Sequence, residues 1–260
     1  MKKYPSAYDV LGNVAIVKFS KEVKPSEKKK FGEKVLKENP SVKTVLEKVG
    51  DFKGRLRKMK TAFVAGEKNK EVLYKENGCV FRFNIDSTYF SPRLSNERKE
   101  VASLIKKGEE VLVMFAGVAP FSVVIAKNSQ AKKVYSNEIN REANKYAELN
   151  VARNKVKDKV ELLNGDIKRV AKKLGRNFDV IVMPRPQLKD SFLEQAFVLS
   201  KKGTRIYYYD FCRESEIDLI VEKVNSEAKK FGKKIKILNV KKAGDIAPYK
   251  YRVRIDLKVS

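Results

Sequence analysis

Residues 111 to 122, which read VLVMFAGVAPFS, constrain the possible fold more than any other stretch of this chain. A short apolar run, Val111 to Phe115, leads into the small pair Ala116-Gly117, and a helix-like segment begins at Phe121. This pattern predicts a buried parallel strand that turns sharply into a helix. Gly117 stands where a ligand could touch the backbone, because glycine has no side chain to keep it away.

A second apolar strand, 133–137, follows and ends at Glu138. In open α/β sheets an acidic residue at the end of the second strand hydrogen-bonds ribose hydroxyls beside a ligand held by the first turn. The turn has one glycine instead of the G-x-G-x-x-G that wraps a pyrophosphate, so it predicts a nucleoside cofactor without phosphates, S-adenosylmethionine being the obvious one. The alternative is that Gly117 only allows close packing and Glu138 is a solvated strand end.

The charge of the chain indicates a polyanionic partner. Its 58 Lys and Arg residues exceed its 32 Asp and Glu residues, giving a formal net charge of +26. An excess of this size is typical of nucleic-acid binding. A lysine-rich thermophile surface is the alternative, but such surfaces usually balance Lys with Glu.

Composition also excludes several classes of protein. The chain has no His, and its two Cys, Cys79 and Cys212, lie far apart, which excludes a zinc site of the usual Cys/His kind and predicts no metal. Neither a signal peptide nor a run of membrane-spanning length is present, so we expect a cytoplasmic protein. We also expect a monomer.

Two parts are visible along the 260 residues. Residues 1–84 form short strands (14–19, 61–64, 80–84) and a Lys-rich helix (27–38), which predicts a small α/β domain. Residues 85–260 alternate strands and helices and end in a hairpin, which predicts five parallel strands followed by an antiparallel pair, the layout of a class I (Rossmann-like) methyltransferase. The expected strands of this second part are 111–116, 133–137, 159–163, 179–183, 204–209, 235–242 and 250–258, and the expected helices are 96–107, 121–128, 140–153, 167–174, 190–200 and 214–231.

One ten-residue segment makes the resemblance specific. Residues 89–98 read YFSPRLSNER and precede the cofactor turn. Together with the MFAGV turn, Glu138 and the Asn-Gly-Asp that ends at Asp166, this segment resembles the archaeal and eukaryotic tRNA guanine-N1 methyltransferases, which act at position 37, just 3′ of the anticodon. The likeness covers residues 8–260. The alternative for the segment is a plain helix start with Ser95 as N-cap.

The resemblance implies roles that the chemistry requires. Guanine N1 carries a proton at neutral pH, so a carboxylate base and a cation at O6 would together favour the attacking form. The resemblance assigns the base to Glu97 and the cation to Arg57, although Arg57 lies in a basic stretch that could simply contact phosphates. It assigns Tyr89, Arg93 and Arg98 to binding the extruded base and phosphates of the tRNA anticodon stem-loop.

For the cofactor, the resemblance implies a site built from the turn and from later strand ends. Asp166 would bind the adenine amino group of S-adenosylmethionine. The full set of expected cofactor residues is Phe115, Ala116, Gly117, Val118, Glu138, Asp166 and Pro184.

The chain departs from the family pattern after strand 179–183. The usual tripeptide there is Asn-Leu-Pro or Asn-Pro-Pro, whereas this chain has Pro184-Arg185-Pro186, so Arg185 and Pro186 become the expected substrate contacts. A proline-rich tripeptide is similar to that of an archaeal subgroup that also methylates 4-demethylwyosine, a wyosine precursor. Family members often carry a further N-terminal domain that touches the tRNA elbow, and this sequence does not predict one.

Two other functions remain open. The related aminocarboxypropyl transferase of wyosine synthesis shares the fold and cofactor, but its members lack a full SPRLxxER, so the pair Glu97-Arg98 favours methyl transfer. A non-catalytic RNA-binding protein with a methyltransferase fold is the other alternative. Retention of Glu97, Gly117 and Glu138 together argues against it.

Overall fold

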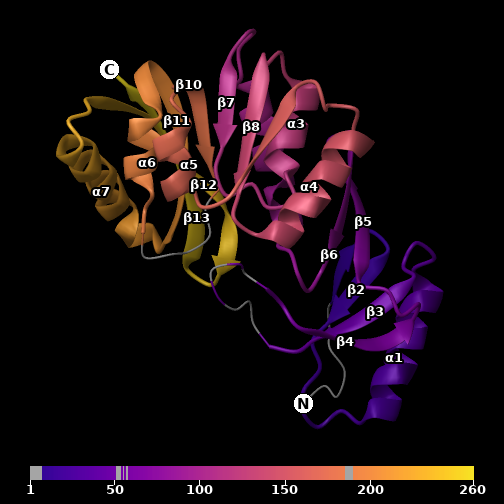
Figure 1. Cartoon of the computed structure of the whole chain (residues 1–260). Coiled ribbons are helices and arrows are strands. Elements are labelled where there is room, and N and C mark those ends of the chain that lie inside the picture. Colours follow the sequence, from indigo (N-terminus) through magenta and orange to yellow (C-terminus); the bar gives the residue numbers. More distant parts are fainter. Residues whose placement is uncertain (1–7, 51–53, 55, 57, 185–189) are drawn as a thin grey trace. The chain divides into compact units, whose positions relative to one another are not determined.

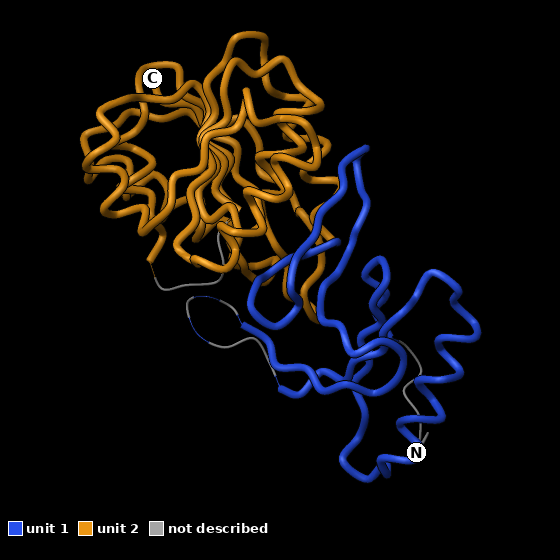
Figure 2. Tube along the Cα trace, turned by 45° about the vertical axis from the view of Figure 1, so that its right-hand side comes forward, with its two compact units in different colours: residues 1–92 blue, residues 93–260 orange. Residues whose placement is uncertain are grey.

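The computed structural model describes residues 8–50, 54, 56, 58–184 and 190–260. The chain divides into two compact units, residues 1–92 and 93–260 (Figures 1 and 2). The boundary lies further along than the one expected after residue 84. The reason is aromatic packing: the ring of Phe90 stacks on Phe83 with centroids 4.7 Å apart and also contacts Tyr74, so this segment belongs to the first unit.

The first unit is a small α/β domain. Four strands form one sheet in the order β1-β2-β3-β4, and β5 pairs with β6 as an antiparallel hairpin. Helix α1 begins at Pro25, a residue suited to the first helical turn, and buries Gly32 and Val35. The elements are β1 (Asp9–Leu11), β2 (Val14–Val17), α1 (Pro25–Glu38), β3 (Thr44–Lys48), β4 (Thr61–Gly66), β5 (Glu71–Glu76) and β6 (Cys79–Asn84).

The expected helix and strands of this unit are confirmed, and β1, β3 and β5 are additional. Two of these strands, β5 and β3, escaped the sequence pattern for a physical reason. Strand β5 reads EVLYKE and pairs with β6 alone, so only Val72 and Glu76 are buried and no apolar run marks it. Strand β3 reads TVLEK, which is too short for an alternation to stand out.

The second unit is built on a seven-stranded sheet in the order β12-β13-β11-β10-β7-β8-β9. Five strands are parallel, and β13 inserts antiparallel between β11 and β12, which confirms the class I methyltransferase layout. The strands are β7 (Glu110–Val113), β8 (Lys133–Glu138), β9 (Val160–Asn164), β10 (Phe178–Met183), β11 (Ser200–Cys212), β12 (Ile235–Ala247) and β13 (Lys250–Val259), and the helices are α2 (Ser95–Ser103), α3 (Pro120–Asn128), α4 (Arg141–Arg153), α5 (Ile167–Lys173), α6 (Leu193–Val198) and α7 (Ile217–Lys230), with 3-10 turns η1 (Pro92–Leu94) and η2 (Glu214–Glu216).

Helices cover both faces of this sheet (Figure 1). Helices α5, α6 and α7 share one apolar core with the central strands, in which Leu112, Met183 and Phe197 are fully buried. The carboxyl ends of β7, β8 and β9 meet at one edge, because Val113 pairs with Ser136 and β8 in turn pairs with β9. In open parallel sheets this edge is where ligands bind.

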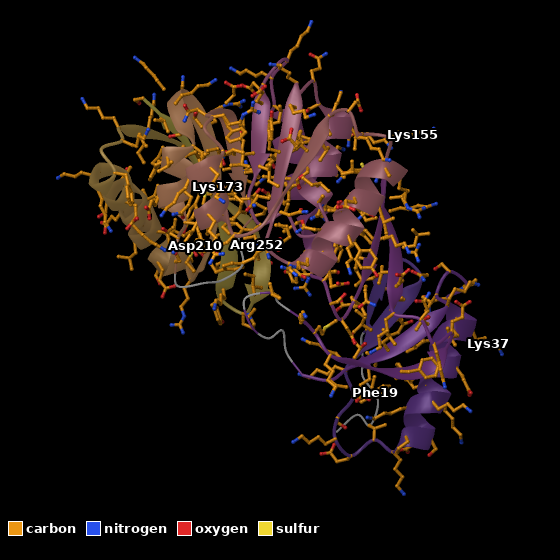
Figure 3. All side chains as sticks on the ribbon, in the orientation of Figure 1. Phe19, Lys37, Lys155, Lys173, Asp210 and Arg252 are labelled. Atoms are coloured by element: carbon orange, nitrogen blue, oxygen red, sulfur yellow. The ribbon has the colours of Figure 1, made fainter. Side chains whose placement is uncertain are left out.

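The cationic surface is spread over many elements. Lys37 on α1, Lys155 after α4 and Lys173 at the end of α5 are all exposed (Figure 3). Within the part of the chain that the structure describes, no helix is long and apolar enough to span a membrane. Nor do the described residues contain a group of three or more Cys, Asp or Glu side chains placed to hold a metal ion.

Candidate active site

The turn between β7 and α3 has an unusual backbone. Phe115, Gly117 and Ala119 all adopt the left-handed conformation, with φ of 57°, 59° and 65°. For residues other than glycine this conformation costs roughly 1–2 kcal/mol each, and such strain tends to persist at ligand-binding positions. The backbone N–H of Ala116 donates to the carbonyl of Asn137 at 2.8 Å, which ties the turn to the end of β8.

Glu138 at the end of β8 holds this turn in place. Its Oε2 accepts a hydrogen bond from the backbone N–H of Gly117 at 2.8 Å, and its Oε1 accepts one from the N–H of Asn140 at 2.7 Å. The carboxylate is therefore fixed beside the glycine where the sequence placed a ligand. The solvated strand end that was the alternative for Glu138 is not what the structure shows.

Asp166 lies at the neighbouring strand end and caps helix α5. Its Oδ1 accepts a hydrogen bond from the N–H of Lys168 at 3.0 Å. The preceding residue, Gly165, donates its N–H to the carbonyl of Glu138 at 2.8 Å. The side-chain amide of Asn137 also donates to the carbonyls of Leu163 and Gly165. The loops that carry Glu138 and Asp166 are thus bonded directly to each other.

The structure brings Gly117, Glu138 and Asp166 to one edge of the sheet, as the sequence predicted. This arrangement fits an adenosine-containing cofactor: a carboxylate for ribose hydroxyls, a second acidic side chain nearby, and a turn without the further glycines that a pyrophosphate needs. Phe115 packs edge-to-face on Phe192 with centroids 4.9 Å apart, which fixes one wall of the turn. The other expected cofactor residues are Ala116 and Val118, which are buried within the turn, and Pro184, which is half-buried just after β10.

Glu97, the expected base, lies in the first turn of α2 and is 5% exposed. Its Oε2 accepts hydrogen bonds from Nη1 of Arg254 at 2.8 Å and from the hydroxyl of Tyr209 at 2.9 Å. Its Oε1 lies 3.2 Å from Nζ of Lys241. Three donors from β11, β12 and β13 therefore fix the orientation of this carboxylate.

Arg254 is the centre of a larger, partly buried cluster. Its guanidinium is 1% exposed and also pairs with Asp256, at 2.7 Å from Nε to Oδ1, and with Glu100, at 2.7 Å from Nη2 to Oε1. Lys241 pairs with both Glu97 and Glu100. Three carboxylates thus face two cations, and the cluster carries one excess negative charge.

Burial and charge shift the pKa values of Tyr209 and Arg254 in this cluster. Burial raises the pKa of Tyr209 well above its usual value and the adjacent Glu97 carboxylate adds to the effect, so its hydroxyl stays protonated and donates. Burial lowers the pKa of Arg254, but hydrogen bonds to Asp256 and Glu100 outweigh it and the net shift is upward. Arg254 is therefore a permanent cation.

The remaining expected substrate residues have different surroundings. Tyr89 is half-buried in the first unit, and Arg93 is exposed on η1. Arg98 is 1% exposed, with its guanidinium 5.7 Å from the ring centre of Phe121, so in this structure it packs inside the unit and does not face solvent. Its predicted substrate contact stays a prediction, as do those of Arg57, Arg185 and Pro186, which lie outside the described residues.

The alternative for residues 89–98 was a plain helix start with Ser95 as N-cap. The residue before α2 is Leu94 and makes no side-chain cap, so Ser95 is not the N-cap.

The sequence reasoning missed the partners of Glu97. Arg254 and Asp256 stand two apart in β13, which places them on the same face of a strand that is buried from Val253 to Leu257. Charged residues in a central buried strand are rare unless they are paired. The two-residue spacing of Arg254 and Asp256 was the one signal in the sequence, and it does not indicate that Arg254 pairs with Glu97.

The comparisons with known proteins decide the family. Residues 72–238 match the model of the TRM5/TYW2 methyltransferase domain, and residues 1–69 match that of the TYW2 N-terminal domain. The chain belongs to the TRM5/TYW2 methyltransferase family. Its fold is that of the S-adenosylmethionine-dependent methyltransferases of this family, as the sequence predicted.

Two curated relatives match almost the whole chain. The tRNA (guanine(37)-N(1))-methyltransferase Trm5b of Pyrococcus abyssi is 35% identical over 98% of this chain and 76% of its own length. The tRNA (guanine(37)-N(1))/4-demethylwyosine(37)-methyltransferase Taw22 of Nanoarchaeum equitans is 32% identical over 96% of this chain and 99% of its own length.

Two solved structures of proteins named Trm5 and TYW2 are similar to almost the whole of this chain. The complex of aTrm5 with tRNALeu has a TM-score of 0.85 at 27% identity and covers 99% of this chain and 73% of that one. The TYW2 of P. horikoshii in complex with MeSAdo has a TM-score of 0.83 at 26% identity and covers 99% of this chain and 92% of that one.

Proposed function

We propose that this chain transfers a methyl group from S-adenosylmethionine to N1 of guanosine 37 in tRNA, with the anticodon stem-loop as the part of the tRNA that it binds. The observation that carries the proposal is the Glu97 carboxylate, which lies within the SPRLSNER segment and is oriented by Arg254 and Tyr209. The named activity of the Pyrococcus abyssi relative supports the same reaction. We propose that the first unit positions the RNA and its target base.

The edge formed by Gly117, Glu138 and Asp166 would hold the cofactor. S-adenosylmethionine supplies the methyl group as an electrophile when it is bound. The task of Glu138 is to hold the ribose through hydrogen bonds that its anchored carboxylate can accept. Asp166 would accept from the adenine amino group, and the Gly117 backbone would allow the nucleoside to approach closely.

Glu97 would accept the N1 proton of guanine as N1 attacks. The electron pair released on N1 would form the new bond to the methyl carbon while the bond from that carbon to the sulfonium sulfur breaks and its electrons pass to sulfur, and the proton would stay on the carboxylate. Here the cluster has one carboxylate more than it has cations, so Arg254 and Lys241 keep Asp256 and Glu100 as partners after Glu97 is neutralised.

Arg57 would place its charge at O6 and favour the form of guanine that attacks. Tyr89 and Arg93 would hold the extruded base and its phosphates, and Arg185 and Pro186 would also contact the substrate. These roles rest on the resemblance of the sequence to the family.

Methylation of 4-demethylwyosine is the second candidate. The Nanoarchaeum equitans relative is named for both reactions and matches over nearly the whole of both chains. The Pro184-Arg185-Pro186 tripeptide supports this candidate as well.

The test is the identity of the nucleoside that is formed. The purified chain is incubated with S-adenosylmethionine and two tRNA transcripts, one with guanosine 37 and one with adenosine 37, and nucleosides are identified by mass spectrometry. We expect 1-methylguanosine from the first transcript and no product from the second. A tRNA that carries 4-demethylwyosine tests the second activity. An aminocarboxypropyl product, or no product on any of these tRNAs, would overturn the proposal.

A further inference from the structure

The tip of the β12–β13 hairpin has a residue that the backbone alone would not select. Ala247 pairs with Lys250, which leaves Pro248 and Tyr249 as a two-residue loop. Tyr249 has a φ of 59°, in the left-handed region that favours glycine or asparagine at this turn position. A bulky aromatic residue is unfavourable there, so folding of the hairpin does not explain its presence.

Packing does not explain it either. Tyr249 is 81% exposed, the largest exposure among the large hydrophobic residues of the described chain. Ile246, two residues before the turn, is also exposed. Tyr249 therefore has an unfavourable backbone conformation that is not offset by burial of its ring. Functional residues are expected at such positions.

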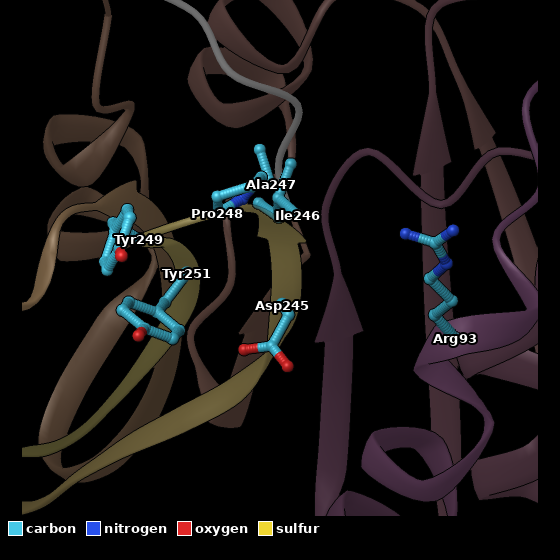
Figure 4. Close-up of a pocket in the computed structure, with 7 residues that line it drawn as sticks. All are labelled: Arg93, Asp245, Ile246, Ala247, Pro248, Tyr249 and Tyr251. Carbon is cyan, nitrogen blue, oxygen red and sulfur yellow. The ribbon is translucent and has the colours of Figure 1, made fainter. Parts of the chain in front are cut away.

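The hairpin lines an open cavity of about 350 Å³. Figure 4 shows the rings of Tyr249 and Tyr251 on the hairpin, the carboxylate of Asp245 on the neighbouring strand, and the guanidinium of Arg93 on the other side of the pocket. Its walls therefore combine aromatic faces, one cation and one anion. None of its lining residues belongs to the cofactor edge or to the Glu97 cluster.

This combination of groups fits a nucleotide. Exposed aromatic rings are platforms on which unpaired bases stack. Arginine matches the geometry of phosphate, while a carboxylate accepts hydrogen bonds from base amino groups. Asp245 also distinguishes a nucleotide from a free phosphate or another small anion, because a carboxylate repels an anion but binds the edge of a base.

We propose that this hairpin pocket binds one unpaired nucleotide of the tRNA substrate next to the one that is methylated, with its base on Tyr249 and with Arg93 at the phosphate that the two nucleotides share. The inference rests on the proposed function for the identity of the RNA. The net charge of +26 supports a polyanion as the occupant.

The test uses the conflict between folding and binding at Tyr249. Tyr249→Gly removes the ring and relaxes the turn, whereas Tyr249→Phe keeps the ring. With an anticodon stem-loop RNA as the probe, Tyr249→Gly should bind about 5- to 150-fold more weakly, the range that corresponds to loss of one stacked base. Its urea unfolding midpoint should be equal to or above that of the wild type, and Tyr249→Phe should bind nearly as the wild type does.

A fluorescent base shows which nucleotide is bound. 2-Aminopurine is placed in turn at each loop nucleotide other than 37, and we expect the wild type to quench its fluorescence at one position. This quenching should be lost in Tyr249→Gly and kept in Tyr249→Phe.

Wild-type affinity in Tyr249→Gly would overturn the inference, as would loss of affinity together with loss of stability. Methyl transfer at saturating RNA separates the two proposals. If the wild type forms 1-methylguanosine and Tyr249→Gly binds RNA normally, only the pocket fails; if the wild type forms no product but Tyr249→Gly still loses affinity, only the proposed reaction fails.

Discussion

Oε2 of Glu97 lies 2.8 Å from Nη1 of Arg254, although the two residues are 157 positions apart in the chain. The contact links the first turn of α2 to the middle of β13. Both side chains are buried, at 5% and 1% exposure. A buried charge without a partner is costly, and this contact gives each of the two side chains one of its opposite charges.

Replacement of Glu97 by glutamine should reduce turnover far more than tRNA binding. A positioned base contributes roughly 100- to 10,000-fold, so the single-turnover rate should fall by about that factor. Glutamine keeps the size of the side chain, and RNA affinity should hardly change. Single-turnover kinetics and a binding titration on the same RNA measure the two effects.

Glu100→Gln is the matched control. Glu100 also pairs with Arg254 and Lys241, but it is the half-exposed member of the cluster. This variant removes a carboxylate from the same cations and should keep most of the turnover. Equal losses of the single-turnover rate in the two variants would show that the cluster matters only for folding. A near wild-type rate in Glu97→Gln would show that the N1 proton leaves by another route.

Arg254→Met should destabilise the second unit. Removal of one partner of a buried ion pair typically costs about 3–5 kcal/mol, and here Glu97 and Asp256 would both lose their main cation. The free energy of unfolding, from urea titration, measures the loss. Replacement of the exposed Arg153 at the end of α4 by Met serves as the control and should change stability by less than about 0.5 kcal/mol. If the two substitutions lowered the free energy of unfolding equally, the buried ion pairs of Arg254 would not be what stabilises the second unit.

The placement of Gly117, Glu138 and Asp166 at one edge of the sheet could be predicted from the sequence because its determinants are local. The apolar run before Gly117 predicts a buried strand, and each acidic residue follows directly on such a strand. Parallel topology then brings the strand ends together, as the bond between Gly117 and Glu138 confirms. What the pattern could not give is the left-handed backbone at Phe115 and Ala119, since neither residue type predicts it.

The surroundings of Glu97 could not be predicted, because they depend on contacts between distant segments. The resemblance pointed to Glu97, but Tyr209, Lys241 and Arg254 come from three strands late in the chain. They become neighbours only because β13 inserts between β11 and β12. A hairpin is visible in the sequence, whereas its order in the sheet is not.

Cofactor binding should depend on the backbone at Gly117. Its φ of 59° is accessible to asparagine but strained for valine, so Gly117→Val confounds loss of space with backbone strain. Gly117→Asn keeps the conformation and adds a side chain at the turn. We expect calorimetry to show weaker S-adenosylmethionine binding in Gly117→Asn at an unchanged thermal midpoint. Wild-type affinity in this variant would show that the cofactor lies elsewhere.

The ion pairs of Glu100 with Lys241 and Arg254 should make the folded state less stable as the pH falls. Burial raises the pKa of Glu100, but hydrogen bonds from Lys241 and Arg254 outweigh it and lower that pKa below the ordinary value. A lowered pKa in the folded state contributes stability that is complete above the unfolded value of about 4.3 and is lost as the pH falls through the folded value. The urea midpoint of the wild type should therefore fall more steeply below about pH 4 than that of Glu100→Gln. Glu142→Gln, whose carboxylate forms an exposed pair with Lys145, is the control and should follow the wild type.

RNA affinity should fall steeply with salt, because a chain with a net charge of +26 releases many counterions when it binds RNA. About six phosphate contacts would cost on the order of a thousand-fold in affinity between about 50 and 200 mM salt. Titration of an anticodon stem-loop RNA at several salt concentrations gives the slope, from which the number of contacts follows. Binding of S-adenosylmethionine, for which we propose contacts with a single turn and two carboxylates, serves as the internal control and should change little over the same range. A flat slope for the RNA would mean that the lysines serve solubility or thermal stability and that the RNA is held by uncharged contacts.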